Sequence, residues 1–316
     1  MEAFNDTLIF NRATLLPSSD QNQYQYNWPG AQTFKDTGIA VKTVSIPYSW
    51  KNITAAYGNN TFQIKWPLAQ LTGTTTSMTT ITVTIPDGNY GVDGDNSLNA
   101  FLQQYCIDND LYLVDSTGSY VYFISCQPNS VYYSVEFDFY PIPLSANITT
   151  ALPALPTAGN YAYPASWPTN LTGYTSYFTP QMVVPVATTT NSWSSYIGYA
   201  AGTYPTLSYD ATAAVVGVQS TFAPQVSPVQ SIIMGLSIVT NRVGLNPTVI
   251  SCFGISNTTY GQNIIYQPSA QWYSKVLDGT FNSVTLTFYD QDFNAIPIYD
   301  PNINVEFALI KNFVPK

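Results

Sequence analysis

Histidine is absent from this 316-residue chain, and charged side chains make up only 9% of it. Without imidazole, a Ser-His-Asp or Cys-His nucleophile system cannot form, and most catalytic zinc sites lose their usual ligand. A typical soluble domain has about 25% charged residues, so neutral polar groups must keep this chain soluble. An enzyme built from it would depend on carboxylates, tyrosine or lysine for proton transfer, and we expect none.

Basic residues are scarce through the middle of the chain. The sequence has 9 basic and 18 acidic residues, a net charge of −9, and no Lys or Arg between Trp66 and Asn241. Between Phe139 and Asn241 the single charged residue is Asp210. Nucleic acid and anionic lipid both attract basic patches. We therefore expect neither a nucleic-acid partner nor membrane insertion.

Cysteine is also sparse, with Cys106, Cys126 and Cys252 as the three residues present. No pair has C-x-x-C spacing, and an odd count argues against a disulfide framework. We expect three buried, reduced thiols in a reducing compartment. The acidic start lacks the basic region of a secretory signal, and the longest apolar run, about ten residues around 231–239, is too short to span a bilayer.

Strand patterns dominate what is present. Apolar and polar residues alternate in 81–85, 131–139, 284–288 and 305–309, a period typical of half-buried strands. Further strands are expected over 39–48, 61–66, 111–114, 120–126, 231–240, 248–254 and 263–267. One helix is predicted from Leu98 to near Asn109, because its apolar side chains follow the i, i+3, i+4, i+7, i+8 spacing. The preceding Asn or Asp residues are available as its N-cap.

These elements predict an all-β fold, a single jelly-roll β-sandwich with a long loop insertion and one short helix. The nearly uncharged, Pro- and Tyr-rich stretch predicts ordered loops and short strands. We expect residues 1–145 to form the first part of the jelly roll with an N-terminal arm, 146–230 a loop-rich insertion, and 231–316 the second part. Deleting 146–230 should then leave a folded sandwich. A compact double jelly roll stays open as an alternative.

Paired carboxylates are the remaining candidates for chemistry. Glu136 and Asp138 would share one face of a strand, where two carboxylates could act as acid and base. The opposite face is the apolar one, so we expect a solvated pair without catalytic function. Asp290 and Asp292 indicate a turn, and the loop 87–96 departs from EF-hand spacing. The sequence thus indicates no catalytic, cofactor-binding or metal-ligating residue.

Three segments together resemble a known family. The first segment has the sequence Thr-Val-Ser-Ile-Pro-Tyr-Ser-Trp-Lys-Asn-Ile over 43–53 and continues as Tyr-Gly-Asn-Asn-Thr-Phe over 57–62. The second is Val-Thr-Ile-Pro-Asp-Gly-Asn-Tyr over 83–90, and it leads into the predicted helix. The third comprises Met234, 263–266, 275–282 and 286–290. Their order and spacing resemble the penton, or minor capsid, proteins of virophages and polinton-like viruses. The resemblance covers roughly 40–140 and 231–316.

The resemblance implies a jelly-roll subunit that forms homopentamers at the fivefold vertices of an icosahedral dsDNA virus capsid. Its partners would be other copies of itself and trimers of the major capsid protein. It would reside in the virion after assembly in the host cytoplasm, with no catalysis and no obligatory cofactor. We expect the acidic residues to lie away from the subunit interface, and 146–230 to form the outward or axial part of the vertex. Alternatives are a trimeric double-jelly-roll major capsid protein, a carbohydrate-binding or adhesin β-sandwich, and a carboxylate-based enzyme.

Overall fold

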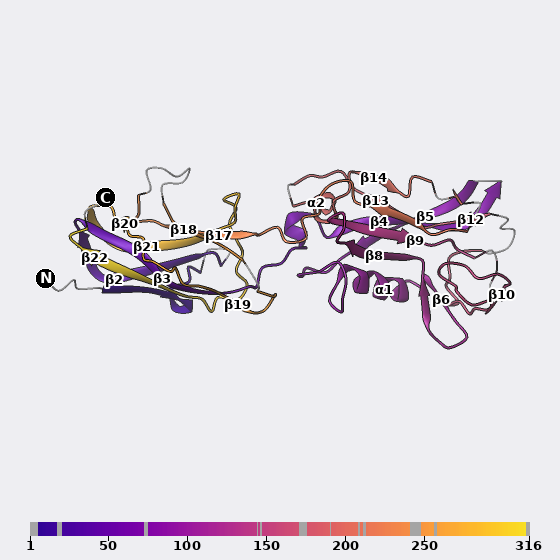
Figure 1. Ribbon diagram of the computed structural model, residues 1–316, viewed down its shortest axis with the longest axis horizontal. Coiled ribbons are helices and arrows are strands. Elements are labelled where there is room, and N and C mark those ends of the chain that lie inside the picture. Colours follow the sequence, from indigo (N-terminus) through magenta and orange to yellow (C-terminus); the bar gives the residue numbers. More distant parts are fainter. Residues whose placement is uncertain are drawn as a thin grey trace. The chain divides into compact units, whose positions relative to one another are not determined.

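Two compact units make up the computed structural model (Figure 1), which describes residues 6–17, 21–72, 75–143, 145, 147–170, 176–189, 191–207, 209–210, 213–240, 248–255 and 258–313. The jelly-roll unit comprises 1–50 and 229–316, and the inserted unit comprises 51–228. Each unit encloses a hydrophobic cluster of its own. The described elements are mostly strands, which confirms the predicted all-β class.

The jelly-roll unit consists of two antiparallel sheets. One has the order β1 (Asp6–Asn11), β22 (Asn304–Lys311), β3 (Thr37–Pro47), β19 (Asn263–Tyr266), with β20 (Ser274–Lys275) also paired to β3. The other has the order β18 (Val249–Gly254), β17 (Ser231–Leu236), β21 (Gly279–Tyr289), β2 (Gln23–Phe34). We number the strands of this unit one to eight along the chain and count β19 and β20 as one interrupted strand. The first sheet then has the order 1-8-3-6 and the second the order 5-4-7-2, which is the arrangement of a single jelly roll.

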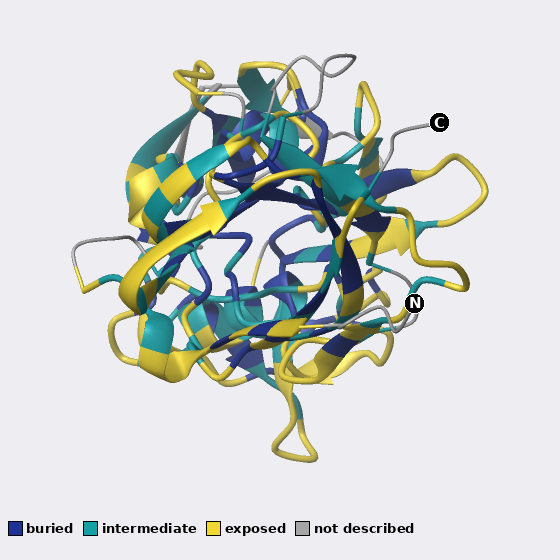
Figure 2. Ribbon diagram, turned by 90° about the vertical axis from the view of Figure 1, so that its left-hand side faces the viewer, coloured by how far each residue is buried: buried dark blue, intermediate teal, exposed yellow. Residues whose placement is uncertain are grey.

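Alternation along these strands builds the core of the jelly-roll unit. Val284, Leu286 and Phe288 of β21 are completely buried, and Thr285 between them is half-buried. Edge-to-face ring contacts join neighbouring strands on the buried face of a sheet, with centroids 5.9 Å apart for Tyr24 of β2 and Phe288 of β21. Buried and exposed residues alternate along the strands in Figure 2.

The inserted unit has two larger sheets and several short pairs. Its sheets have the orders β14 (Gly202–Tyr204), β13 (Gln181–Val184), β4 (Thr61–Thr72), β5 (Thr75–Thr84), and β16 (Val216–Gln219), β9 (Ser134–Phe139), β8 (Ile124–Asn129). The short pairs are β6 (Tyr112–Val114) with β7 (Tyr120–Tyr122), β10 (Asn147–Ile148) with β11 (Gly159–Asn160), and β12 (Tyr177–Phe178) with β15 (Tyr209–Asp210). Helices α1 (Leu98–Asp108) and α2 (Trp193–Ile197) belong to this unit, as does the 3-10 turn η2 (Ala55–Tyr57), whereas η1 (Arg12–Thr14) belongs to the jelly roll.

The insertion into the jelly roll is longer than the sequence suggested. The chain leaves the jelly-roll unit after Trp50 and re-enters it at Val229. Within the inserted unit, β13 pairs with β4 and β16 pairs with β9, so 146–228 completes sheets that 61–139 begins. The boundary expected at 145/146 follows a loss of charge, whereas the structural boundary follows backbone pairing. Segment 146–230 is therefore not a separable loop region.

Local expectations differ in several details. The predicted helix is confirmed as α1, but its N-cap is Ser97, whose side chain accepts from Ala100 N, rather than an Asn or Asp. Residues 131–133 form a turn before β9, because Asn129 must face Ser134 across the hairpin. The strand expected over 231–240 ends at Leu236, and 120–126 divides into β7 and β8. Helix α2 was not predicted.

No helix among the described residues is long and apolar enough to cross a membrane. The acidic start at residues 1–5 lies outside the described residues.

Candidate functional site

The side chain of Asn52 is the centre of a buried hydrogen-bond network in the inserted unit. Its Oδ1 accepts from Tyr90 N at 2.9 Å, and its Nδ2 donates to the carbonyl oxygens of Tyr90 at 2.7 Å and Val226 at 2.8 Å. The residue is 4% exposed. One amide thus holds three chain segments that are distant in sequence, and both ends of the inserted unit are fixed at this point.

Backbone pairing connects the same segments. Asn52 N and Ile53 N both donate to Gly88 O at 3.1 Å, and Gly88 N donates to Ile53 O at 2.9 Å. Asn59 closes the loop between them, since its Nδ2 donates to Asn52 O and its Oδ1 accepts from Thr54 N, each at 2.8 Å. The first and second segments of the family resemblance therefore interlock directly.

The turn 86–90 is shaped by the ring of Tyr90. Its hydroxyl donates to Pro86 O at 2.9 Å, which folds the ring over Gly88. A Cβ on Gly88 would lie 2.7 Å from that ring, so a larger residue there would require the ring to shift. Asp87 Oδ1 accepts from Ala55 N at 2.9 Å. Burial, and to a lesser degree the charge of Asp87, raises the pKa of Tyr90.

Helix α2 adds a third element to the network. Tyr196 is 2% exposed, and its hydroxyl donates to Tyr90 O at 2.9 Å. Burial raises the pKa of this phenol, which stays protonated as a donor. Beside it, Trp193 stacks on Phe62 of β4 with ring centroids 4.7 Å apart. Sequence reasoning placed Asn52 and Tyr90 in motifs but did not identify Tyr196, which lies in the segment expected to be loop.

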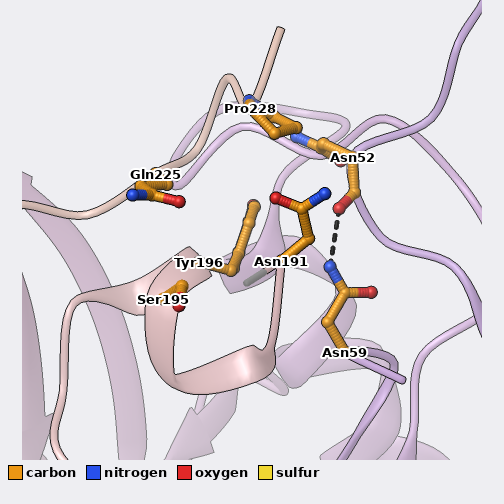
Figure 3. Close-up of a pocket in the computed structure, with 7 residues that line it drawn as sticks. All are labelled: Asn52, Asn59, Asn191, Ser195, Tyr196, Gln225 and Pro228. Atoms are coloured by element: carbon orange, nitrogen blue, oxygen red, sulfur yellow. Dashed lines mark hydrogen bonds between the residues drawn. The ribbon is translucent and has the colours of Figure 1, made fainter. Parts of the chain in front are cut away.

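A small hollow of about 10 Å³ adjoins this network (Figure 3). Its lining is almost entirely neutral and polar: Asn52, Asn59, Asn191, Ser195, Tyr196, Gln225 and Pro228. The volume suits about one water molecule. With amides and hydroxyls as its polar side chains, the network serves to position chain segments.

Glu136 and Asp138 lie on one face of β9, as predicted, but they are half-buried rather than fully solvated. Asn129 Nδ2 donates to Glu136 Oε2 at 3.1 Å, and Gln127 Nε2 donates to Asp138 Oδ2 at 3.0 Å. The absent side chain of Gly217 leaves room for both carboxylates, since a Cβ there would lie 2.9 Å from Glu136 Oε1. Burial first, and the charge of Glu136 second, raise the pKa of Asp138.

The other acidic candidates have structural partners. Asp290 Oδ1 accepts from Asp292 N and Asn294 N, each at 2.8 Å, which confirms the predicted turn after β21. In the described part of the chain, no group of three or more His, Cys, Asp or Glu residues could hold a metal ion.

The three cysteines are free thiols, but they do not share one environment. Cys106 and Cys126 are buried in the cluster of the inserted unit, and burial raises the pKa of Cys106 to about 12. Cys252, by contrast, is exposed on β18, an edge strand of the jelly-roll unit. The expectation of three buried thiols was therefore wrong for Cys252, because the alternation of β18 turns this side chain outward.

Large apolar side chains are exposed in two segments that sequence reasoning missed. Val131, Tyr132 and Tyr133 form the tip of the β8–β9 hairpin and are 83%, 68% and 71% exposed. In the jelly-roll unit, Ile265 on β19 and Trp272 in the following loop are 69% and 83% exposed. Contiguous exposed apolar groups, as at the hairpin tip, are typical of contact surfaces.

The chain is similar in fold to a solved structure. No protein-family model matches this chain, and no curated protein does. The crystal structure of SeMet-labelled mavirus penton protein is similar over 98% of this chain and 98% of its own, with a TM-score of 0.44 and 12% sequence identity.

Proposed function

We propose that this protein is a structural subunit of an icosahedral viral capsid, and specifically a penton subunit that forms homopentamers at the fivefold vertices of a dsDNA virus. The virion vertex is then its location, and trimers of the major capsid protein are its neighbours. Its task is to present rigid surfaces for repeated contacts, without catalysis.

The observation that carries the proposal is the contact among the three family-like segments. In the jelly-roll unit, Ile264 and Tyr266 of the third segment lie opposite Ile46 and Val44 of the first. In the inserted unit, Asn52 and Ile53 of the first segment bind the turn of the second. Segments that together resemble penton proteins are thus in contact within each unit, which supports the resemblance.

The fold supports a role in assembly. A jelly roll has two edge strands in each sheet, here β1 and β19 in one and β18 and β2 in the other, and edges are where neighbouring subunits can add contacts. Heterologous contacts between identical copies close into a ring when the rotation permits. The exposed Val131–Tyr133 tip and Trp272 supply apolar surface for such contacts.

The native mass of the purified protein tests the proposal. Five copies of the 34.8 kDa chain would give about 174 kDa by light scattering. A mass near 104 kDa, three copies, would contradict the pentamer and favour a trimeric coat protein, an alternative suggested by the presence of two β units. A monomer at every concentration, combined with failure to fill vertices of a shell assembled from its major capsid protein, would contradict the capsid role.

A further inference from the structure

The β6–β7 hairpin of the inserted unit borders a hollow of about 180 Å³. One wall is the hairpin turn, with Asp115, Ser116, Thr117 and Val121. The other is the segment 156–161, which leads into and includes β11. Val114 at the end of β6 and Ala162, which follows β11, pair through N–H···O bonds of 2.8 and 3.0 Å. The hollow is separate from the Asn52 network.

Both walls are fixed before any ligand arrives. Asp115 Oδ1 accepts from Thr117 N at 2.8 Å, Thr117 Oγ1 at 2.7 Å and Ser119 N at 2.9 Å. These bonds, the Thr117 hydroxyl foremost, hold the pKa of Asp115 below its ordinary value. On the opposite wall the Tyr161 hydroxyl donates to Thr157 O at 2.6 Å. A preorganised site of this kind loses little entropy on binding.

Three polar groups of the lining keep their hydrogen-bonding capacity. Among the described residues, none bonds to Asp115 Oδ2, to the Ser116 hydroxyl or to the Asn160 side-chain amide. They offer a charged acceptor, a group that both donates and accepts, and an amide with two donors and an acceptor. Pro156, Ala158 and Val121 add apolar surface. The combination matches a ring that carries several hydroxyls and an apolar C–H face.

Charge and size narrow the ligand class further. No Lys or Arg occurs between Trp66 and Asn241, and Asp115 repels anions, so phosphates and acidic sugars fit badly. The volume is well below the roughly 300–1,000 Å³ of pockets for drug-sized ligands. We propose that the hollow between 115–121 and 156–161 binds a single ring of a neutral sugar, with Asp115, Ser116 and Asn160 as its polar contacts. This activity goes beyond the capsid role and does not depend on it.

Saturation-transfer NMR on the full chain tests the proposal, with glucose, galactose, mannose and N-acetylglucosamine as neutral probes and N-acetylneuraminic acid as the anionic one. We expect at least one neutral sugar to bind with a Kd on the order of 1 mM, as for a small ligand in an open site. The Asn160→Ala variant should weaken binding at least about fivefold. Ala158→Trp, which fills the hollow, should abolish it. Asn27→Ala, an exposed amide of the jelly-roll unit, should leave it unchanged.

Each other outcome overturns the proposal. Absence of transfer to all four neutral sugars would show that the hollow is not a sugar site. Equal transfer in the native chain and in Ala158→Trp would place the sugar elsewhere, provided that both melt at the same temperature. Stronger binding of N-acetylneuraminic acid than of any neutral sugar would contradict the assigned role of the Asp115 charge.

Discussion

The two units differ in charge far more than in secondary structure. The inserted unit has 2 basic and 9 acidic residues, whereas the jelly-roll unit has 7 and 9. Each unit nevertheless folds as antiparallel sheets around a hydrophobic cluster of its own. Apolar alternation and aromatic burial therefore suffice to specify these sheets, and balanced charge is not required.

The polar contacts of the two units differ accordingly. The jelly-roll unit has ion pairs on its surface, as in Lys42 with Glu306 at 3.1 Å and Lys275 with Asp278 at 3.0 Å. The inserted unit depends on buried neutral groups such as Asn52, Asn59 and Tyr196. Exposed ion pairs contribute little, whereas a buried amide is costly to lose.

Truncation of one core residue in each unit is expected to have the largest effect. Phe307→Ala in the jelly-roll unit and Phe137→Ala in the inserted unit each remove a completely buried ring and should each cost about 3–5 kcal/mol. Because the clusters are separate, calorimetry should show two transitions, with each variant lowering its own. Phe222→Ala, 45% exposed, is the control. A single transition that both truncations lower equally would contradict the separation.

Removal of the Asn52 side-chain amide is expected to cause the second-largest loss of stability. Asn52→Ala deletes three hydrogen bonds and leaves Tyr90 N and Val226 O without these partners, at a cost of about 2–4 kcal/mol in the free energy of unfolding. Only the transition of the inserted unit should fall, as measured by calorimetry against Asn27→Ala. A loss no larger than that of Asn27→Ala would mean that the network is not the clamp of this unit.

The matching test in the jelly-roll unit removes the ion pair between Lys42 and Glu306. The Lys42 and Glu306 side chains are 52% and 23% exposed, so Lys42→Met should cost less than about 1 kcal/mol. High salt should shrink the difference further, because it screens exposed charges. Chemical denaturation by urea, with and without added NaCl, measures both. A cost as large as that of Asn52→Ala would reverse the comparison between the units.

The smallest predicted effect on stability comes from the neighbouring carboxylates Glu136 and Asp138 in the inserted unit. The raised pKa of Asp138 means that its charge opposes folding once the pH exceeds that pKa. Below the unfolded pKa, about 3.9, the carboxyl is neutral in both states and the penalty vanishes. Asp138→Asn should therefore raise the melting temperature at pH 7 by less than about 2 °C, with no gain near pH 3. A gain that persists unchanged at pH 3 would exclude this electrostatic cause.

The sequence predicted the elements that local pattern determines. The apolar spacing of Leu98, Leu102 and Cys106 predicted α1, and alternation predicted the core of β21. Val131, Tyr132 and Tyr133 favour a strand by propensity, yet they form the turn that the register of β8 with β9 requires. At this hairpin the strand pairing, and not the local strand propensity, determines the structure.

Long-range pairing was beyond prediction. Strand β13 has four residues and pairs with β4, more than a hundred positions earlier in the chain. Nothing in the composition around Trp50 and Lys51 marks the start of the inserted unit. The motifs placed Asn52 and Tyr90 correctly, but their contact with Tyr196 and Val226 depends on the tertiary fold.

The central structural claim is that 51–228 is a complete β unit inserted between the third and fourth strands of a jelly roll. Its most direct test is the amide proton–nitrogen NMR spectrum of residues 51–228 expressed alone, recorded on heating. The Asn52–Val226 bond holds the two ends of this segment together, and the described residues of its hydrophobic cluster all lie within 51–228. The account predicts well-dispersed resonances that disappear in one cooperative transition. Poorly dispersed amide resonances, as given by an unfolded chain, would contradict it.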